Sequence, residues 1–220
     1  MINKDFLNKF NHFYSDIKKS FNKIYKNSNF YDKKISKIFN NDFQYKPSPF
    51  LLSSIINYQN KKYKIEDFAV ESIWKKDVDI KDFKKLNNFF WFFSLDLKSS
   101  KKTTQSIITN WIINNKKYNE KSWDIDLTSK RIISWLSNHQ LTFENSEKEY
   151  RKKFHHIIQK QTNHLINEIK NSNDLENQII SCSAIILSGL AYQNNKNYLN
   201  IGLNLLKNII KSSIDNSGFP

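Results

Sequence analysis

Glycine and proline are scarce in this chain, with three of each among 220 residues. A turn-rich β-sandwich or a fold built on glycine loops needs more of both, so these classes are disfavoured. Phosphate-loop, dinucleotide and nucleophile motifs are also absent from the sequence. The composition predicts a mainly α-helical fold, in a chain long enough for one domain with a sizeable core.

Cysteine is nearly absent as well. Cys182 stands alone, which excludes an intramolecular disulfide framework and a cysteine zinc site. Its neighbours in "IISCSAIILSGLA" are apolar, so we expect a buried structural thiol. Histidines with metal-ligand spacing and a carboxylate partner are also missing, so the sequence predicts no metal site.

Basic residues dominate the charge, with 35 lysines and arginines against 21 acidic residues and a net charge of +14. Lysine, asparagine, isoleucine and phenylalanine have AT-rich codons and are all abundant, so base composition accounts for the lysines. They are spread along the chain rather than gathered into one stripe, and we expect no nucleic-acid partner. A basic surface still favours anionic ligands, such as an acidic polysaccharide.

Long apolar runs are missing. The amino terminus "MINKDFLNKFNHFYSDIKK" scatters charges through its apolar positions, so no export signal is visible. The most apolar run, "FFWFF" at 89–93, is too short to cross a bilayer. We therefore predict no membrane insertion.

Apolar residues recur at helical spacing along most of the chain. Asp79 and Asp126 are candidate N-caps, and Ser146 and Glu149 have the spacing of a capping box. Connections between the helical segments are short, so consecutive helices should pack antiparallel. We predict helices over residues 3–27, 31–39, 79–97, 100–115, 126–140, 146–170, 174–192 and 196–213.

The region around 45–75 has the weakest helical pattern. Two prolines in "YKPSPF" force an extended backbone, and "KKYKIEDFAV" alternates in the manner of a short strand. We expect a short extended or β segment there.

One stretch, "KSWDIDLTSKRIISWLSNHQ" at 121–140, holds two of the five tryptophans and one of the two arginines. On a helix, Arg131, Trp135 and His139 share a stripe, and an arginine can stack on a tryptophan four residues away. Aromatic faces bind sugars and guanidinium groups bind carboxylates, so together with Trp123 this stripe predicts one wall of an acidic-sugar site. The structural alternative is that Trp135 is a core residue and Arg131 pairs with a helix C-terminus or an acidic neighbour.

Six segments carry a family resemblance. Their order resembles the amino-terminal half of heparinase II/III-like proteins, most closely the alphaproteobacterial branch, and covers residues 60–220. The ordered set carries the resemblance, not any one motif. The segments are "LNNFFWFFSLDL", "IITNWI", "SWDIDLTSKRIISWL", "FHHIIQKQTNHLINEI", "NQIISCSAIILSGLAY" and "LLKNIIKSSIDNSGFP".

The resemblance implies a fold and an activity. The residue pattern predicts an amino-terminal helix and an extended lead-in over residues 1–75, and the resemblance implies that residues 76–220 form part of an incomplete α/α toroid of antiparallel helix hairpins. In the family the rest of the toroid and a β-sandwich follow. The implied activity is that of a polysaccharide lyase, which cleaves uronic-acid-containing chains by β-elimination without metal or organic cofactor. A base removes the C5 proton, a group neutralises the carboxylate, and an acid protonates the leaving oxygen.

The resemblance also supplies site candidates. The matching segment carries over Trp123, Arg131 and Trp135 as substrate-binding residues, and Asn177 and the turn at 215–218 are weaker candidates. The catalytic residues are expected beyond residue 220. The chain would then be inactive alone, and its partner would be the missing carboxy-terminal half of the protein.

Two further expectations concern the surroundings of the chain. Helices 174–192 and 196–213 should expose an apolar face toward the missing half. The family resemblance implies the cell envelope or periplasm, although no signal peptide is visible. The alternative function is a non-catalytic helical module that binds an anionic glycan or a partner protein.

Overall fold

Helices make up nearly all of the chain that the computed structural model describes, which is residues 4–36, 55–58, 61–64, 79–94, 101–192 and 196–213. The predicted mainly α-helical class is confirmed. The helices are α1 (Lys4–Lys26), α2 (Asn29–Ile35), α4 (Ile80–Asn87), α5 (Lys101–Asn115), α6 (Ile125–Ser137), α7 (His139–Thr142), α8 (Lys148–Glu168), α9 (Leu175–Ala191) and α10 (Lys196–Ser213), with 3-10 turns η2 (Phe90–Ser94) and η3 (Ile169–Asn171).

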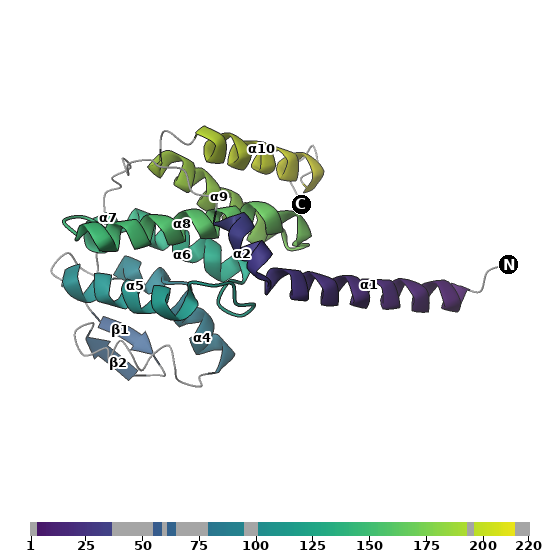
Figure 1. Ribbon diagram of the computed structural model, residues 1–220, viewed down its shortest axis with the longest axis horizontal. Helices are drawn as coiled ribbons and strands as arrows, with labels where there is room; N and C mark the ends of the chain where they lie inside the picture. Colours follow the sequence, from purple (N-terminus) through teal and green to yellow (C-terminus); the bar gives the residue numbers. More distant parts are fainter. Residues whose placement is uncertain are drawn as a thin grey trace.

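A β-hairpin occupies the middle of the region predicted to be extended. Strands β1 (Ile55–Tyr58) and β2 (Lys61–Lys64) pair antiparallel, with Ile55 opposite Lys64. The hairpin lies at one edge of the body, and α10 lies at the opposite edge (Figure 1). The predicted short β segment is therefore confirmed within 45–75.

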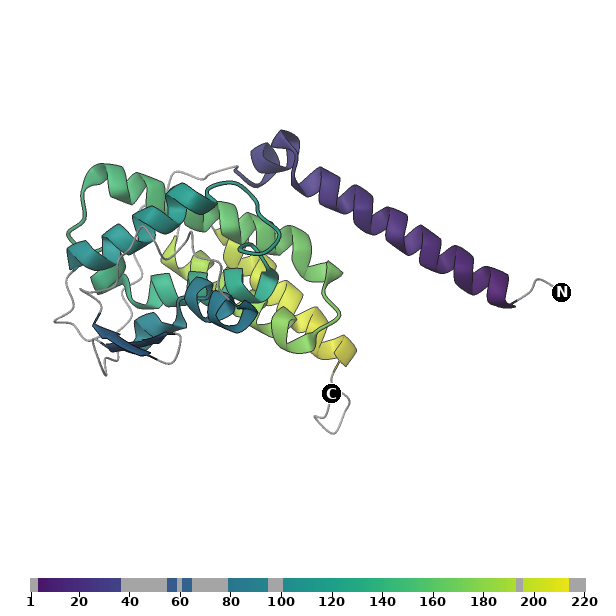
Figure 2. The same cartoon turned by 90° about the horizontal axis from the view of Figure 1, so that it is seen from below.

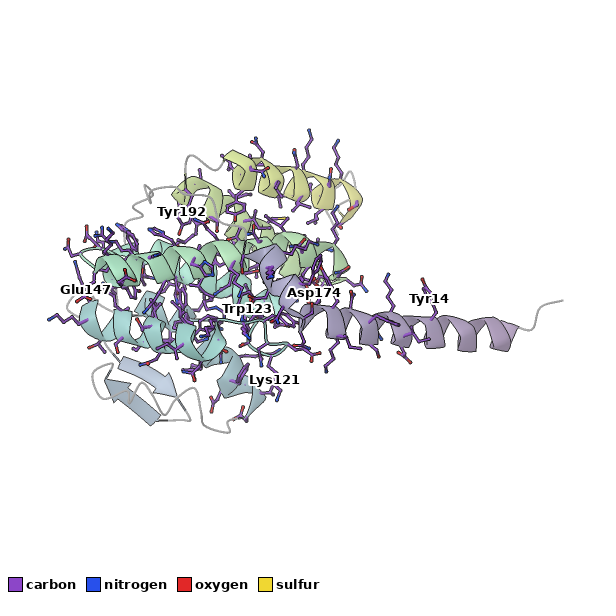
Figure 3. All side chains as sticks on the ribbon, in the orientation of Figure 1. Tyr14, Lys121, Trp123, Glu147, Asp174 and Tyr192 are labelled. Atoms are coloured by element: carbon purple, nitrogen blue, oxygen red, sulfur yellow. The ribbon has the colours of Figure 1, made fainter. Side chains whose placement is uncertain are left out.

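Helices α8 and α9 run in opposite directions through the body, as their short connection predicts. Glu147 and Tyr192 lie toward one end of the molecule and Asp174 lies toward the other, so α8 and α9 are antiparallel (Figure 3). Helix α9 packs on α6 and on α10, and α8 contacts both α6 and α9. Closure of these hairpins into a toroid stays a prediction.

Two glycines bring α9 and α10 unusually close. A Cβ atom added at Gly189 would lie 2.4 Å from the backbone nitrogen of Leu199, and one at Gly202 would lie 2.7 Å from Cγ1 of Ile186. At Gly189 the neighbour is backbone, which cannot rotate away as a side chain can. The absence of a side chain at Gly189 is therefore what permits this helix contact.

The single helix predicted over 79–97 is wrong. Helix α4 ends at Asn87, and Phe89 has a φ of 59°, in the left-handed region that side chains disfavour. Phe89 is fully buried, and its ring lies edge-on to Trp135 with centroids 5.0 Å apart. Burial of this ring in the aromatic core compensates the strained backbone, and a continuous apolar run hid the turn from the sequence pattern.

Helix caps follow the sequence only in part. Asp79 caps α4 as predicted, because its carboxylate accepts hydrogen bonds from the amides of Lys81 and Asp82. The predicted cap at Asp126 is wrong: α6 is capped by Asp124, which accepts from the amide of Asp126. The capping box predicted for α8 from Ser146 and Glu149 is also wrong.

The residue that precedes α8 is Glu147, not Ser146. Ser146 Oγ instead donates to the carbonyl of Phe143, which closes the preceding turn. The predicted helix over 126–140 likewise divides into α6 and α7, and Asn138 lies at the junction.

The amino-terminal segment joins the same core as the later helices. Tyr31 and Ile35 of α2 are buried in one apolar cluster with residues of α5, α6, α8 and α9. Helix α1, by contrast, projects from the body as an arm (Figure 2). The domain boundary at residue 75 stays a prediction.

The last two helices expose apolar side chains, as expected. Leu190 of α9 and Leu203 and Ile210 of α10 are exposed. None of the described helices is both long enough and apolar enough to cross a membrane.

Candidate functional site

Arg131 is the most connected polar side chain of the core. Its Nε donates to Oε1 of Gln161 at 3.0 Å, one terminal nitrogen donates to the carbonyl of Asn87 at 2.8 Å, and the other donates to the carbonyl of Ser122 at 3.0 Å and to Oγ1 of Thr128 at 3.2 Å. The guanidinium carbon lies 4.0 Å from the centroid of the Trp111 ring. The side chain therefore joins α4, α5, α6, α8 and the loop before α6.

The predicted role of Arg131 and Trp135 as a sugar-binding wall is contradicted by their burial. Both side chains are fully buried, and the ring that Arg131 faces is that of Trp111, not Trp135. The structural alternative is confirmed: Trp135 is a core residue, and Arg131 donates to Asn87, the last residue of α4. His139, at the start of α7, is also buried.

Among the described residues, no carboxylate contacts the guanidinium of Arg131. Burial lowers its pKa, and the more distant Asp124 opposes that shift. The guanidinium nevertheless stays protonated at neutral pH, because four acceptors and an aromatic face stabilise the cation and its ordinary pKa lies far above neutrality. An arginine is needed here because only its planar fork reaches acceptors on several sides.

Trp123 lies where this core meets the surface. Its indole Nε1 donates to the carbonyl of Asn115 at 3.0 Å, and its own carbonyl lies 2.8 Å from Nε2 of His164. The other ring nitrogen of His164 lies 2.6 Å from the hydroxyl of Tyr31. A carbonyl can only accept, so we assign the proton to Nε2, and Nδ1 then accepts from Tyr31.

A groove opens beside Trp123, between the end of α1 and the start of α9. It consists of two adjoining cavities of about 310 and 350 Å³ that share Lys26, Tyr118 and Glu120. We call it the α1–α9 groove. Its lining comprises Lys19, Ser20, Asn22, Lys23, Lys26, Tyr118, Glu120, Trp123, Asp124, Ile125, His164, Glu168, Asn171, Ser172 and Asn177.

The two ends of the groove differ in chemistry. The α1 end carries Lys19, Lys23 and Lys26, and the α9 end carries the amides of Asn171 and Asn177 beside Trp123. Figure 3 shows Trp123 and Asp174 near the place where α1 meets the body. Cations, amides and aromatic rings are the groups that hold acidic sugars.

The lysines of the groove face carboxylates. Lys23 lies 2.8 Å from Glu120, and both side chains are largely exposed, so this pair contributes little to stability. The hydrogen bond from Lys23 lowers the pKa of Glu120. Lys26 pairs with Glu168, which is mostly buried and also accepts from the amide of Asn171 at 3.3 Å. Lys23 is therefore available for exchange with a ligand, and Lys26 is held in place.

Tyr118 is the hydroxyl donor at the centre of the groove. It is half-buried, and burial, followed by nearby Glu120, raises its pKa to about 12. The phenol is protonated at neutral pH and can donate a hydrogen bond to a sugar oxygen.

The structure brings together two of the five predicted site residues, Trp123 and Asn177, in this groove. Trp123 presents little surface there because its ring is buried, and Asn177 is half-buried in the first turn of α9. The turn at 215–218 lies outside the described residues. Sequence reasoning missed Lys26, Tyr118 and Glu168, because they come from segments far apart in the chain and share no local pattern.

Within the described ranges, no group of three or more histidine, cysteine or acidic side chains could hold a metal ion. The polar side chains that line the groove are lysines, amides, serines, the phenol of Tyr118, the ring of His164 and the carboxylates of Glu120, Asp124 and Glu168. Comparison of the chain with protein-family models, with curated proteins and with solved structures finds no match.

His164 predicts a pH dependence of stability. Burial, partly opposed by Glu168, lowers the pKa of His164 to about 4, below its unfolded value near 6.5. The unfolded chain therefore binds the proton first as the pH falls below 6.5, and about 3 kcal/mol of stability is lost by pH 4. His164→Gln keeps an acceptor and a donor but cannot titrate.

Urea unfolding measured from pH 7 to pH 4 checks this. The wild type should lose more stability over that range than His164→Gln does. The matched control, His156→Gln, removes an exposed ring whose pKa is lowered less strongly, by partial burial and by Lys160, so it should follow the wild type more closely than His164→Gln does. Parallel curves for the wild type and His164→Gln would contradict the assignment.

Proposed function

We propose that this chain is the helical, substrate-binding part of a heparinase II/III-like polysaccharide lyase, and that the α1–α9 groove binds an acidic sugar of the polysaccharide. The proposal rests first on the ordered motifs that resemble that family. The observation that carries it is the groove itself, which has the exposed Lys23 at one end, the hydroxyl-bearing Tyr118 at its centre and the side-chain amides of Asn171 and Asn177 at the other end.

The groove chemistry suits a uronic acid. A uronate presents one carboxylate and several hydroxyls on a single ring. The carboxylate would replace Glu120 as the partner of Lys23, because that pair is exposed and weakly held. The hydroxyls would accept from Tyr118 and bind the amides of Asn171 and Asn177, which lie on the far side of Lys26.

The proposal assigns binding rather than proton abstraction to this groove. Both ring nitrogens of His164 are hydrogen-bonded, and its pKa of about 4, set mainly by burial, makes it a poor base. No catalytic residue is assigned. Trp123 would act as the fixed wall of the groove, because its carbonyl and indole are both hydrogen-bonded to the body.

Binding is tested by titrating the 220-residue chain with uronate oligosaccharides of several backbones, and with a neutral oligosaccharide of equal length. Acidic oligomers should bind and neutral ones should not. Lys23→Gln and Asn177→Ala should each weaken binding about threefold to tenfold, the effect of losing one hydrogen bond to a charged or polar group.

Lys207→Gln is the matched control, because Lys207 is an exposed lysine on α10, away from the groove. It should leave the affinity unchanged. Equal weakening by Lys207→Gln and Lys23→Gln would show that binding follows net charge alone, and the groove would then have no role.

An elimination assay separates the lyase part from a binding module without chemistry. The unsaturated uronate formed by β-elimination absorbs at about 230 nm, and we expect no rise in absorbance from the 220-residue chain alone. Binding without product agrees with this expectation. Sustained product formation would contradict it and would require catalytic residues within this sequence.

A further inference from the structure

Helix α1 exposes an apolar stripe in its carboxy-terminal half, from Tyr14 to Ile24. The side chains of Tyr14, Ile17, Phe21 and Ile24 are exposed by 64, 38, 69 and 69%. Their spacing of three and four residues places them on one face of the helix. Tyr14 lies on the part of α1 that projects beyond the body (Figures 2 and 3). This α1 stripe is a large apolar surface for a protein in water.

The opposite face of α1 is attached to the body. Lys23 and Lys26 pair with Glu120 and Glu168, which belong to the loop before α6 and to α8. These contacts turn the α1 stripe outward. The stripe cannot pack on the body unless both ion pairs break.

The charges around the α1 stripe are basic. In sequence α1 carries six lysines and two aspartates. Lys18 borders the α1 stripe. Near the carboxy-terminal end of the stripe, Nζ of Lys34, a residue of α2, lies 6.0 Å from the centroid of the Tyr25 ring. The described aspartates of α1 and α2 are engaged elsewhere, since Asp16 pairs with Lys19 and Asp32 pairs with Lys160.

We propose that α1 binds the surface of an anionic lipid bilayer, with the α1 stripe facing the acyl chains and the bordering lysines facing the phosphates. A helix with an apolar face of aromatic and aliphatic residues and a lysine-rich polar face is suited to lie in the bilayer interface. The helix lies on the membrane and does not span it, in agreement with the absence of a spanning helix among the described residues. The proposal is independent of glycan binding.

The positive net charge argues against a second copy of this chain as the partner that covers the α1 stripe. Each chain carries a net charge of +14, and two α1 stripes packed together would bring their bordering lysines into contact. An anionic surface gains from the same lysines, because each one near the membrane adds an electrostatic attraction that salt weakens.

Vesicle sedimentation tests the proposal with the full 220-residue chain. The probes are vesicles of phosphatidylcholine alone and vesicles in which about a third of the lipid is phosphatidylglycerol. The wild type should partition to the anionic vesicles, and added salt should release it. Phe21→Ser with Ile24→Ser should weaken partitioning by about tenfold or more, because two apolar side chains no longer leave water.

Leu203→Ser with Ile210→Ser is the matched control, because it removes two exposed apolar side chains from α10. It should bind vesicles as the wild type does, and circular dichroism should show both variants folded. Equal partitioning of the two double variants, or equal binding to neutral and anionic vesicles, would overturn the proposal. A wild-type dimer that Phe21→Ser with Ile24→Ser converts to a monomer, without vesicle binding, would assign the stripe to a second copy instead.

Discussion

Replacing Arg131 by alanine is expected to lower the free energy of unfolding by about 3–5 kcal/mol, the cost of breaking a buried network of a charged group. The loss has three parts. The carbonyls of Asn87 and Ser122 lose their buried donors, and the face of Trp111 loses the guanidinium that covers it. A cavity the size of an arginine side chain remains in the core.

Arg131→Lys keeps the positive charge and is the sharper test. A lysine nitrogen cannot reach acceptors on several sides as the planar fork does, so we expect a loss of about 2–3 kcal/mol. Arg151→Ala removes the other arginine of the chain from an exposed position of α8 and should change stability by less than about 0.5 kcal/mol. Urea unfolding followed by circular dichroism measures all three. An Arg131→Lys variant as stable as the wild type would refute the role of the fork.

Gly189→Ala is expected to destabilise the protein by about 2 kcal/mol or more, although alanine is the better helix former. In an exposed helix this change stabilises by roughly 1 kcal/mol, so the sign of the effect is diagnostic. The added Cβ would lie 2.4 Å from the backbone nitrogen of Leu199 and 2.7 Å from its Cα, so α10 must move away from α9.

Two further variants serve as controls for Gly189→Ala. Gly202→Ala should cost less, because the atom nearest its Cβ is side-chain Cγ1 of Ile186 at 2.7 Å, and the nearest backbone atom, the nitrogen of Ile186, is farther away at 3.1 Å. Ser183→Ala, at an exposed position of α9, should have almost no effect. Unfolding curves together with limited proteolysis of α10 provide the measurements, and a Gly189→Ala variant more stable than the wild type would contradict the close approach of the two helices.

The helical pattern of the sequence predicts much of the fold. Helices α5 and α10 begin and end within one residue of the predicted ranges, because their apolar faces and short connections are local signals. The predicted continuity of 79–97 fails at Phe89, whose left-handed backbone is stabilised by contacts with Trp135, a residue 46 positions away. Local patterns carry no information on such contacts.

The candidate site was less predictable than the fold. Helical spacing correctly places Arg131 and Trp135 near each other, but it cannot tell whether other helices cover that face. In the structure α4, α5 and α8 cover it, so the predicted ligand-binding pair is part of the core. The groove residues Lys26, Tyr118 and Glu168 meet only through tertiary packing.

Core and groove are nonetheless connected through Arg131. It donates to the carbonyl of Ser122, the residue before Trp123, and the Trp123 carbonyl in turn accepts from His164 in the groove wall. Arg131 is therefore a buried residue that helps to position the groove wall through Ser122, and it is not exposed to contact a ligand itself. Replacing Arg131 should therefore weaken the proposed glycan binding only indirectly, by letting the loop before α6 move out of place.

The most direct test of the account is a crystal structure of this chain with a bound uronate oligosaccharide. We predict a sugar in the α1–α9 groove, with its carboxylate on Lys23 and its hydroxyls on Tyr118 and Asn177, while Arg131 keeps its contacts with Asn87 and Ser122. A sugar bound elsewhere on the surface, or a groove that stays empty at saturating oligosaccharide, would contradict the proposed function.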